Sequence, residues 1–266
     1  MYRLEDEIKV KRRIKSIMDQ FDAKKVTTDC VAWIKNLFDT NWSASTNCCV
    51  ALSGGKDSSI VAALAVKALG QNRVKGLLLP QHEQHDISYS IRCAEFLGIE
   101  YKIVNIGSAV DAIIEEMKRS GINPTTQAIT NVPPRVRMTE LYFYAQCVNG
   151  VPSCNCNLSE DWVGYSTYGG DGFGSFAPLS HLTVTEVKQM GYELGLPKEL
   201  IEKPPIDGLC GKTDEDNLGF TYAVLDRYIR TGVCEDEEIK AKIDLLHEKN
   251  KFKLELMPSF PYLGEH

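Results

Sequence analysis

One short segment constrains the fold of this chain more than any other. Residues 48–59 read Cys-Cys-Val-Ala-Leu-Ser-Gly-Gly-Lys-Asp-Ser-Ser, which is an apolar run followed by two glycines and a compact polar loop. Helix-forming residues follow at once over 60–66. This order predicts a strand, a tight loop and a helix start, and the unpaired N–H groups of a helix start bind anionic oxygens.

The residue types in the loop predict phosphate binding together with a metal ion. Gly54 and Gly55 can adopt positive φ and let a ligand approach the backbone, while Ser53 and Ser58 offer hydroxyl groups beside the helix start. Asp57 would repel a polyphosphate unless a divalent cation lies between them. We therefore expect Asp57 to be a ligand of Mg²⁺.

The spacing of the glycines excludes the two commonest nucleotide-binding loops. A P-loop needs four residues between its first glycine and Gly-Lys-Ser/Thr, and a dinucleotide fingerprint needs Gly-x-Gly-x-x-Gly. The sequence Ser-Gly-Gly-x-Asp-Ser instead resembles the pyrophosphate loop of the N-type ATP pyrophosphatases, which split ATP between its α and β phosphates. A chance glycine turn is the alternative interpretation, and the order of strand, glycines, acid and helix argues against it.

Strand-like and helix-like segments alternate after this loop. Strands are expected at 48–52, 74–79 and 101–106, and helices at 58–69, 86–97 and 108–119. The alternation predicts an α/β fold with a doubly wound parallel sheet flanked by helices, in which ligands bind beyond the carboxyl ends of the strands. Leu79 ends the second strand and should border the same crevice.

The remaining segments are expected to belong to the same single domain, 1–266. Packing helices are expected on both sides of a break at 24–28, and further helices at 131–148, 183–194, 214–230 and 235–250. A strand-like run at 154–157 precedes a glycine-rich loop at 164–178, and the tail at 257–262 is irregular. A glycine-rich loop of this length is more often a ligand lid or an interface than core.

Composition limits the partners and the compartment. The net charge is −6, which argues against broad binding to nucleic acid, because such binding needs a basic face. No apolar run has the length of a membrane span, and the charged first residues lack a hydrophobic signal region, so we expect a cytoplasmic protein. The nine cysteines are scattered and mostly lie in apolar surroundings, which predicts free thiols.

Further motifs downstream make the whole chain resemble the ammonia-dependent NAD synthetases, over about residues 25–260. Besides the loop at 53–58, the segments that carry the resemblance are Arg135-Val-Arg-Met-Thr-Glu-Leu141, Asn157-Leu-Ser-Glu160, Gly170-Asp171-Gly172, Lys203-Pro-Pro205 and Thr213-Asp-Glu-Asp-Asn-Leu-Gly-Phe-Thr-Tyr222. The resemblance implies an adenine nucleotide alpha hydrolase-like fold. Each segment alone is a weak signal, and their order and spacing agree together.

The resemblance also implies an activity. ATP would adenylate the nicotinate carboxylate of deamido-NAD with release of pyrophosphate, and ammonia would then displace AMP. Adenylation supplies the leaving group that a carboxylate lacks. A chain of 266 residues leaves no room for a nitrilase-like amidase domain beside the synthetase domain, so free ammonia is the implied nitrogen donor. Family members are homodimers, which implies a homodimer here.

Functional residues are carried over by position. The resemblance implies that Asp57 and Glu160 bind Mg²⁺ and act in catalysis. The implied ATP-binding residues are Ser53, Gly54, Gly55, Lys56, Asp57, Ser58, Leu79, Asn155 and Lys188. The implied contacts of deamido-NAD are Arg135, Tyr168, Asp171 and Lys253.

Three positions depart from the family pattern. Val184 stands where a nucleotide-contacting lysine is usual, and Lys188 is one helical turn later. Ile206 replaces a small Ser or Thr, and Ser175 replaces an acidic residue. These departures bear on substrate contacts rather than on the scaffold.

Two other functions stay open from the sequence. Cys154 and Cys156 would be the reactive pair of a sulfur-transfer ATP pyrophosphatase, although strand packing explains their spacing better, because neither thiol has an evident activating partner in the sequence. A nucleotide-binding regulatory protein with reduced turnover is the other alternative, because Val184 and Ile206 alter contact positions.

Overall fold

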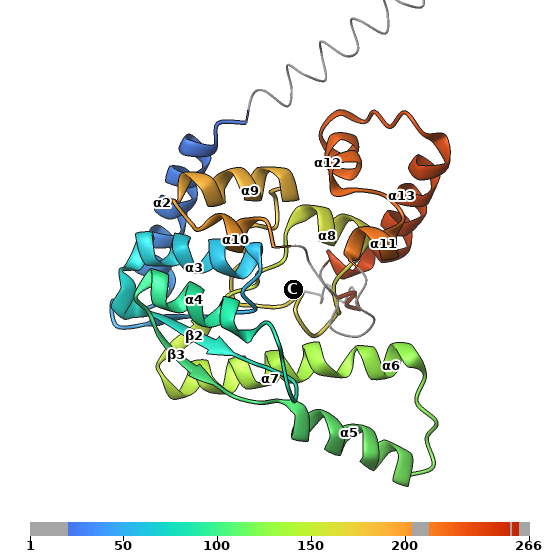
Figure 1. Cartoon of the computed structure of the whole chain (residues 1–266), viewed down its shortest axis with the longest axis horizontal. Coiled ribbons are helices and arrows are strands. Elements are labelled where there is room, and N and C mark those ends of the chain that lie inside the picture. The colour runs from blue at the N-terminus through green and yellow to red at the C-terminus, as the bar shows by residue number, and fades with distance from the viewer. Residues whose placement is uncertain (1–20, 204–212, 256, 261–266) are drawn as a thin grey trace, which may run out of the picture.

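A four-stranded parallel sheet organises the chain. The computed structural model describes residues 21–203, 213–255 and 257–260 (Figure 1). Its strands are β1 (Asn47–Ala51), β2 (Val74–Leu78), β3 (Glu100–Ile103) and β4 (Gly150–Pro152), in the order β3-β2-β1-β4. Every pairing is parallel, with Cys48 opposite Val74 and Asn47 opposite Gly150.

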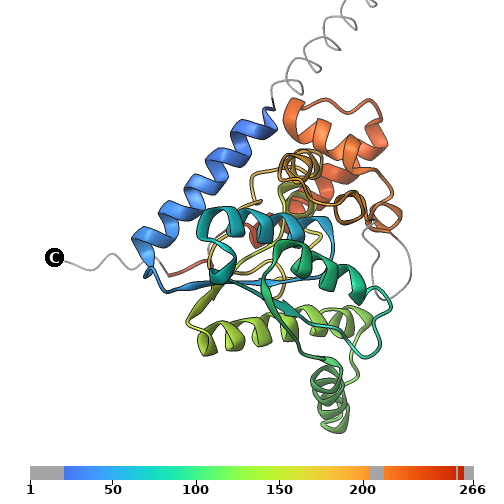
Figure 2. The ribbon, with the colours of Figure 1, turned by 60° about the vertical axis from the view of Figure 1, so that its left-hand side comes forward.

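Helices cover both faces of this sheet. The helices α3 (Lys56–Leu69) and α4 (Ile87–Leu97) connect β1 to β2 and β2 to β3 on one face, where α2 (Ala23–Asn41), α9 (Val184–Glu193) and α10 (Lys198–Ile201) also pack. The helices α5 (Gly107–Arg119) and α7 (Val132–Cys147) cover the other face, with the short α6 (Thr126–Thr130) before α7. Figure 2 shows the sheet between these two layers. The predicted doubly wound α/β fold is confirmed.

Alternation along the central strand explains why both faces are covered. Successive side chains of a strand point to opposite faces. Cys48 and Val50 belong to the core cluster on the α3 face, whereas Cys49 belongs with Leu77 to the cluster on the α7 face. A strand that is apolar at every position can be stable only if helices lie on both sides of it.

A third apolar cluster lies beyond the end of the sheet. It is formed by α8 (Leu158–Val163), α11 (Asp214–Leu218), α12 (Tyr222–Thr231) and α13 (Glu237–Asn250). Val163, Leu225 and Ile243 are among its buried members. The 3₁₀ turns η1 (Gln71–Arg73) and η2 (Lys251–Lys253) complete the described elements.

Three local predictions were wrong. The break expected at 24–28 lies inside α2, because the Asp22 side chain accepts from Lys25 N and so starts the helix earlier. Residues 154–157 are irregular rather than a strand, since Cys154 N turns away to donate to Phe176 O. The single helix expected at 214–230 is two helices.

The interruption between α11 and α12 has a local cause. Gly219 ends α11 with φ 74°, and Thr221 caps α12 by accepting from Val224 N. A left-handed glycine followed by a new N-cap residue stops one helix and starts the next.

The ends of the chain were predicted in part. Residues 257–260 have no regular structure, as expected of the tail. The apolar positions at 8–18 and the last residues of the tail lie outside the described residues. No helix in the described ranges is both long and apolar enough to span a membrane.

Candidate active site

The glycine loop lies where the order of the sheet reverses. Chain connections run from β1 outward to β2 and β3 on one side, and β4 then pairs with β1 on the other. A crevice forms at such a reversal beyond the carboxyl ends of the strands, because the two following segments diverge. Here the two following segments are the loop at 52–55 after β1 and the stretch 153–157 after β4.

Hydrogen bonds fix the shape of the glycine loop. Ser53 Oγ lies 3.1 Å from Ser58 Oγ, and Ser58 Oγ also accepts from Ser53 N over 3.2 Å. Gly55 O accepts from Ser58 Oγ and from Ser59 Oγ, at 3.3 and 2.8 Å. The loop is therefore preorganised at the start of α3, as the sequence predicted.

Gly54 is required by both its conformation and its surroundings. Its φ is +73°, and a Cβ there would lie 2.5 Å from Ser90 N of α4. We expect Gly54→Ala to lower the free energy of unfolding by about 3 kcal/mol, since left-handed strain adds to a clash with backbone. Gly195→Ala is the matched control, because Gly195 has φ +75° and open space around it; it should cost about 1 kcal/mol. Equal losses in urea unfolding would contradict the role of the close approach.

A buried ion cluster lies at the first turn of α3. Lys56 Nζ is 2.8 Å from Asp57 Oδ2 and 3.3 Å from Glu160 Oε1, and Lys56 is only 4% exposed. The two carboxylates come from segments that are far apart in the sequence, and the pairing of β4 with β1 brings them together. The predicted metal ligands thus share one cation.

Asn157 holds Glu160 in this position. Its side-chain oxygen accepts from Glu160 N, which caps α8, and its Nδ2 donates to Asp57 Oδ1 over 3.0 Å. Asn157 therefore joins the helix that carries one carboxylate to the other carboxylate. An Asn three residues before a Glu is a capping signal in the sequence, but it does not reveal the bond to Asp57.

The electrostatics of the cluster favour a bound cation. Burial and the nearby charge of Asp57 raise the pKa of Glu160 to about 8. Burial lowers the pKa of Lys56, but the charges of Asp57 and Glu160 raise it by more, so the ammonium group stays protonated. The raised pKa of Glu160 means that one ammonium group does not offset the repulsion between the two carboxylates, and a further cation would favour the ionised form of Glu160.

A second layer surrounds the cluster and was not predicted. The Tyr222 ring lies 5.7 Å from Lys56 Nζ, and Tyr222 OH donates to Asp214 Oδ2 over 3.3 Å. Burial raises the pKa of Asp214, and the charge of Lys56 partly offsets this. In the sequence Asp214 is an ordinary acidic residue at a helix start. Nothing in the neighbouring residues indicates that it lies beside the ion cluster.

Two predicted ATP contacts lie near the carboxyl ends of the strands and have structural partners. Asn155 Nδ2 donates to Ala51 O over 3.0 Å, and its oxygen accepts from Ser153 Oγ. Leu79 is buried in the cluster on the α7 face, and its carbonyl accepts from Arg137 Nε. Asn155 therefore joins the stretch after β4 to the end of β1, and Leu79 joins the end of β2 to α7.

The four predicted acceptor contacts gather around the glycine-rich loop at 164–178. Arg135 Nε donates to Tyr168 O over 3.2 Å, and the Asp171 side chain accepts from Thr167 N. Lys253 Nζ donates to Gly164 O and Ser166 O, at 2.8 and 2.9 Å. The loop is therefore contacted by α7 through Arg135 and by η2 through Lys253.

Two charged groups near this loop were missed as site residues. Burial and the charge of Asp171 raise the pKa of Asp161 to about 6, and Lys253 partly offsets this. Burial lowers the pKa of Arg137, whose charge acts on Asp171. A titratable group with a pKa near neutrality is typical of a functional site.

Other predicted contacts lie apart from the ion cluster or outside the described residues. Lys188 Nζ pairs with Glu202 over 2.7 Å on the half-exposed side of α9. Val184 is buried in the third apolar cluster, and Ser175 N donates to Pro152 O beside β4. Ile206 lies outside the described residues.

The two cysteines of the sulfur-transfer alternative are buried under the glycine-rich loop. The Sγ atoms of Cys154 and Cys156 both donate to Asp171 O, at 3.5 and 3.3 Å. The pKa of Cys156 is raised by its hydrogen bond with Cys154 and by burial. Their position gives a packing reason for their presence, and sulfur transfer is not favoured.

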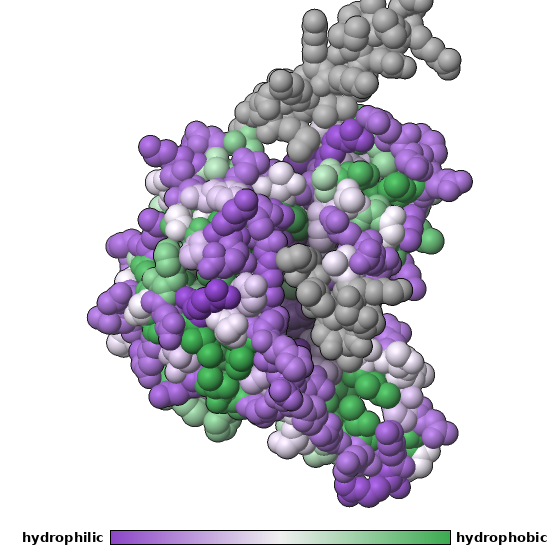
Figure 3. All heavy atoms as spheres, in the orientation of Figure 1, coloured by the Kyte–Doolittle hydropathy of each residue, from purple (hydrophilic) through white to green (hydrophobic). Residues whose placement is uncertain are grey.

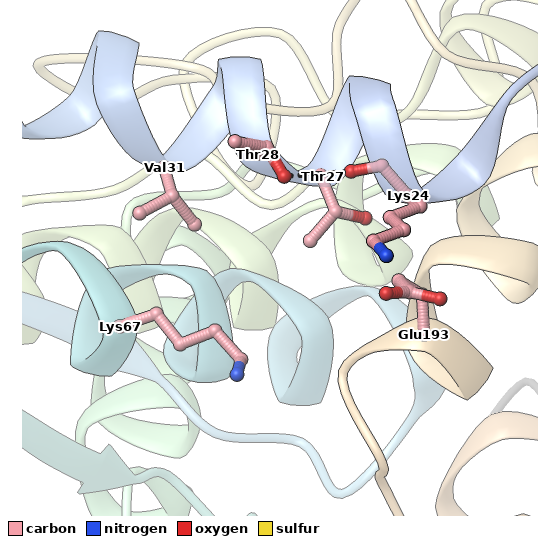
Figure 4. A pocket seen from close by; sticks show the side chains of 6 residues that line it. All are labelled: Lys24, Thr27, Thr28, Val31, Lys67 and Glu193. Carbon is pink, nitrogen blue, oxygen red and sulfur yellow. Dashed lines mark hydrogen bonds between the residues drawn. The ribbon is translucent and has the colours of Figure 1, made fainter.

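A surface cavity of about 190 Å³ lies elsewhere, between α2, α3 and α9 (Figure 4). Its lining consists of Lys24, Thr27, Thr28, Val31, Lys67 and Glu193. Lys67 belongs to the last turn of α3, whereas the glycine loop precedes its first turn. The cavity therefore includes none of the predicted site residues.

Comparison with known proteins agrees with this arrangement. The family model described as NAD synthase matches residues 26–257. The NH(3)-dependent NAD(+) synthetase of Pyrococcus furiosus is 38% identical over 213 residues, which cover 80% of this chain and 79% of the relative.

Solved structures give the same result. The NMN synthetase of Francisella tularensis has a TM-score of 0.83 and 30% identity, over 91% of this chain and 100% of that chain. The NH3-dependent NAD synthetase of Campylobacter jejuni, in complex with the nitrate ion, has a TM-score of 0.73 and 28% identity, over 91% and 99%. A family match over most of the sequence, with the ion cluster and the glycine loop in place, shows that the chain belongs to the NAD synthase family.

Proposed function

We propose that this protein uses ATP to join ammonia to the nicotinate carboxylate of deamido-NAD, which yields NAD, AMP and pyrophosphate. Family membership supports the reaction, and the relatives are named for ammonia as the nitrogen donor. The observation that carries the proposal is the pairing of Asp57 and Glu160 around one cation beside the glycine loop. Such a cluster suits a ligand that brings both phosphate and metal.

In this proposal the loop holds the outer phosphates of ATP. Ser53, Ser58 and the N–H groups at the start of α3 are the donors, and Gly54 and Gly55 allow the phosphates to approach the backbone. Lys56 is the cation of the same loop. In-line attack on the α-phosphate needs only positioning and charge stabilisation from these groups, without a protein nucleophile.

Asp57 and Glu160 suit Mg²⁺ as ligands. A single ammonium group already bridges the two carboxylates, so their spacing fits a shared cation. Within the described ranges no three His, Cys, Asp or Glu side chains are grouped to hold a metal, but Mg²⁺ commonly takes one or two carboxylates and completes its shell with phosphate and water. When bound, the ion would neutralise charge on the leaving pyrophosphate.

The glycine-rich loop is the proposed acceptor site. Arg135 offers a guanidinium fork for a phosphate of the dinucleotide, and Lys253 lies against the same loop, to which Tyr168 belongs. Asp171 stands beside the Arg137 charge. The adenylated carboxylate would then meet ammonia, and AMP would leave as the stable product.

Arg135→Lys tests this site. We expect KM for deamido-NAD to rise at least tenfold while KM for ATP stays within twofold, because a lysine cannot make the bidentate grip. Steady-state kinetics with each substrate varied in turn measures both constants. Arg119→Lys is the control, because Arg119 lies exposed on α5 and pairs with Glu116. Equal rises for both substrates would contradict an acceptor role.

The function itself is tested with purified protein. ATP, Mg²⁺, ammonium and deamido-NAD are incubated with the chain, and NAD, AMP and pyrophosphate are measured. The proposal requires the three products in equal amounts. AMP and pyrophosphate without NAD would reject deamido-NAD as the acceptor.

One observation favours a second acceptor. The Francisella protein, whose structure covers 91% of this chain, is named an NMN synthetase. Nicotinate mononucleotide carries the same carboxylate as deamido-NAD and lacks its adenylate half. The two acceptors, supplied together at equal concentration, compete for the enzyme, so the ratio of NMN to NAD formed reports which one the site prefers.

We also propose a homodimer that forms through the α5–α7 side. Ile113 and Met117 of α5, Ile122 after it and Phe143 of α7 are 41–66% exposed. Figure 3 shows hydrophobic atoms gathered in the region of α5 and α6. Apolar surface of this kind is typical of subunit contacts.

Phe143→Glu should weaken the dimer at least tenfold, because it buries a charge in the proposed contact. Light scattering after size-exclusion chromatography over a concentration series measures the change. Phe96→Glu is the control, since Phe96 is also exposed but lies on α4 at the opposite face. A wild type that stays monomeric at every concentration would refute the dimer.

The cytoplasm is the proposed compartment, and a single domain the proposed organisation. Cys30, Cys48, Cys49, Cys93, Cys147, Cys154, Cys156 and Cys234 are free thiols, and free thiols persist in reducing compartments. The third apolar cluster contacts the rest of the chain through α9, which supports one folding unit.

A further inference from the structure

Lys56 occupies an unusual place for a lysine. It is the first residue of α3, it is 4% exposed, and its ammonium group contacts both carboxylates that are proposed as metal ligands. A lysine with only a structural role usually extends its ammonium group into water. Here the charged end is enclosed at the point where ATP is proposed to bind.

Three acidic side chains lie around this ammonium group. Asp57 and Glu160 contact it directly, and Asp214 lies in the layer behind it, held by Tyr222 OH. One positive charge therefore faces three acidic groups. Carboxylates this close repel one another, and a cation that lies between Asp57 and Glu160 lets both of them ionise.

We propose that Lys56 is a resident counter-ion, which fills the place between Asp57 and Glu160 until a nucleotide-bound divalent cation replaces it. The inference rests on the proposed ATP and metal site. Its consequence is an order of binding: metal alone should bind weakly, because expelling the ammonium group would leave it buried without a partner. Metal that arrives with ATP brings phosphates, which give the released ammonium group new partners.

The side chain is suited to such an exchange. A lysine stem has four carbon atoms and rotates freely, and its ammonium group is a compact point charge without a required geometry. The same group also joins α3 to α8, since Glu160 belongs to α8. Lys56 therefore stabilises the site in the absence of ligand.

The test measures Mn²⁺ binding without nucleotide. The concentration of free Mn²⁺ is read from its electron paramagnetic resonance signal. We expect Lys56→Gln to bind one Mn²⁺ at least tenfold more tightly than the wild type, and its melting temperature to rise with added Mn²⁺. Lys56→Arg, which keeps the charge, should behave like the wild type. The double variant Lys56→Gln/Asp57→Asn should lose the gain, which locates the ion between these residues. Lys240→Gln is the control, because Lys240 pairs with Asp244 on the surface of α13.

Several outcomes would overturn the inference. One is an equal Mn²⁺ affinity of the wild type and Lys56→Gln. Another needs only the wild type: Mn²⁺ affinity that is the same with and without α,β-methylene-ATP would overturn the inference even if the variant fails to fold. If the wild type makes NAD but shows one of these two equal affinities, the inference fails and the proposed function stands. If no protein binds Mn²⁺, even with α,β-methylene-ATP, the metal site and the inference fail together.

Discussion

Asp57→Asn should lower kcat/KM for pyrophosphate release from ATP by about a thousandfold, through the loss of one carboxylate from the proposed metal site. The change preserves shape, and the new side-chain oxygen can still accept the hydrogen bond from Asn157 Nδ2. The fold should therefore survive while the charge disappears. A coupled pyrophosphate assay measures the rate, and circular dichroism checks the fold.

Asp39→Asn is the control for this experiment. Asp39 lies exposed on α2 in a pair with Lys35, and the change should leave the rate within twofold. AMP production by Asp57→Asn at the rate of the wild type would remove the basis for the metal site and for the proposed ligase.

Asp226→Ala should lower the free energy of unfolding by about 3 kcal/mol, because it leaves several buried donors without an acceptor. Asp226 is fully buried in α12 and accepts from Ser159 Oγ, from Thr185 N and from Thr185 Oγ1. Ser159 Oγ accepts in turn from Val184 N. One carboxylate thus joins α12 to α8 and α9, and Glu160 follows Ser159 directly. Activity should fall with stability, as the Glu160 helix loosens.

The loss of stability should depend on pH in a defined direction. Burial raises the pKa of Asp226, and the hydrogen bonds from Ser159 and Thr185 only partly offset this. The folded protein then binds more protons than the unfolded chain between the two pKa values, so this group's contribution is full below the unfolded pKa of about 3.9. It declines as pH rises through the folded pKa. The difference between wild type and Asp226→Ala in urea unfolding should therefore be larger at pH 4 than at pH 7.

Asp39→Ala serves as the control here too, and it should change stability by less than about 0.5 kcal/mol. A loss below about 1 kcal/mol for Asp226→Ala would contradict the three-helix contact.

Elements that depend on contiguous residues were predicted well. The glycine loop, the start of α3 and the alternation of strands with helices follow from local backbone preferences and from apolar periodicity. Segment ends were predicted less well. The break expected at 24–28 is absent, because the cap at Asp22 starts α2 before it. Cys154 leaves the sheet, because its N–H donates to Phe176 O. Both outcomes depend on partners that a local pattern cannot show.

The candidate site was predicted through a family resemblance rather than through geometry. Asp57 carried its own signal, because an acidic residue inside a glycine loop of this kind predicts a metal ion beside phosphate. Glu160 did not, since a single glutamate carries no metal signal. Asn157 and Asp214 belong to segments that carry the resemblance, but no role was predicted for either. Asp226 had only the ordinary interpretation of a helix face, although all three residues lie in the site or support it.

By itself the sequence determined the glycine loop and the class of fold, because positive φ at Gly54, a helix start soon after the glycines and an apolar strand are properties of neighbouring residues. Only the tertiary structure decided that Lys56 meets Glu160, 104 positions along the chain. The reason is the placement of β4 beside β1, which reverses the order of the sheet and directs both following segments into one crevice. A strand order of that kind depends on long-range pairing, and no local stretch of sequence encodes it.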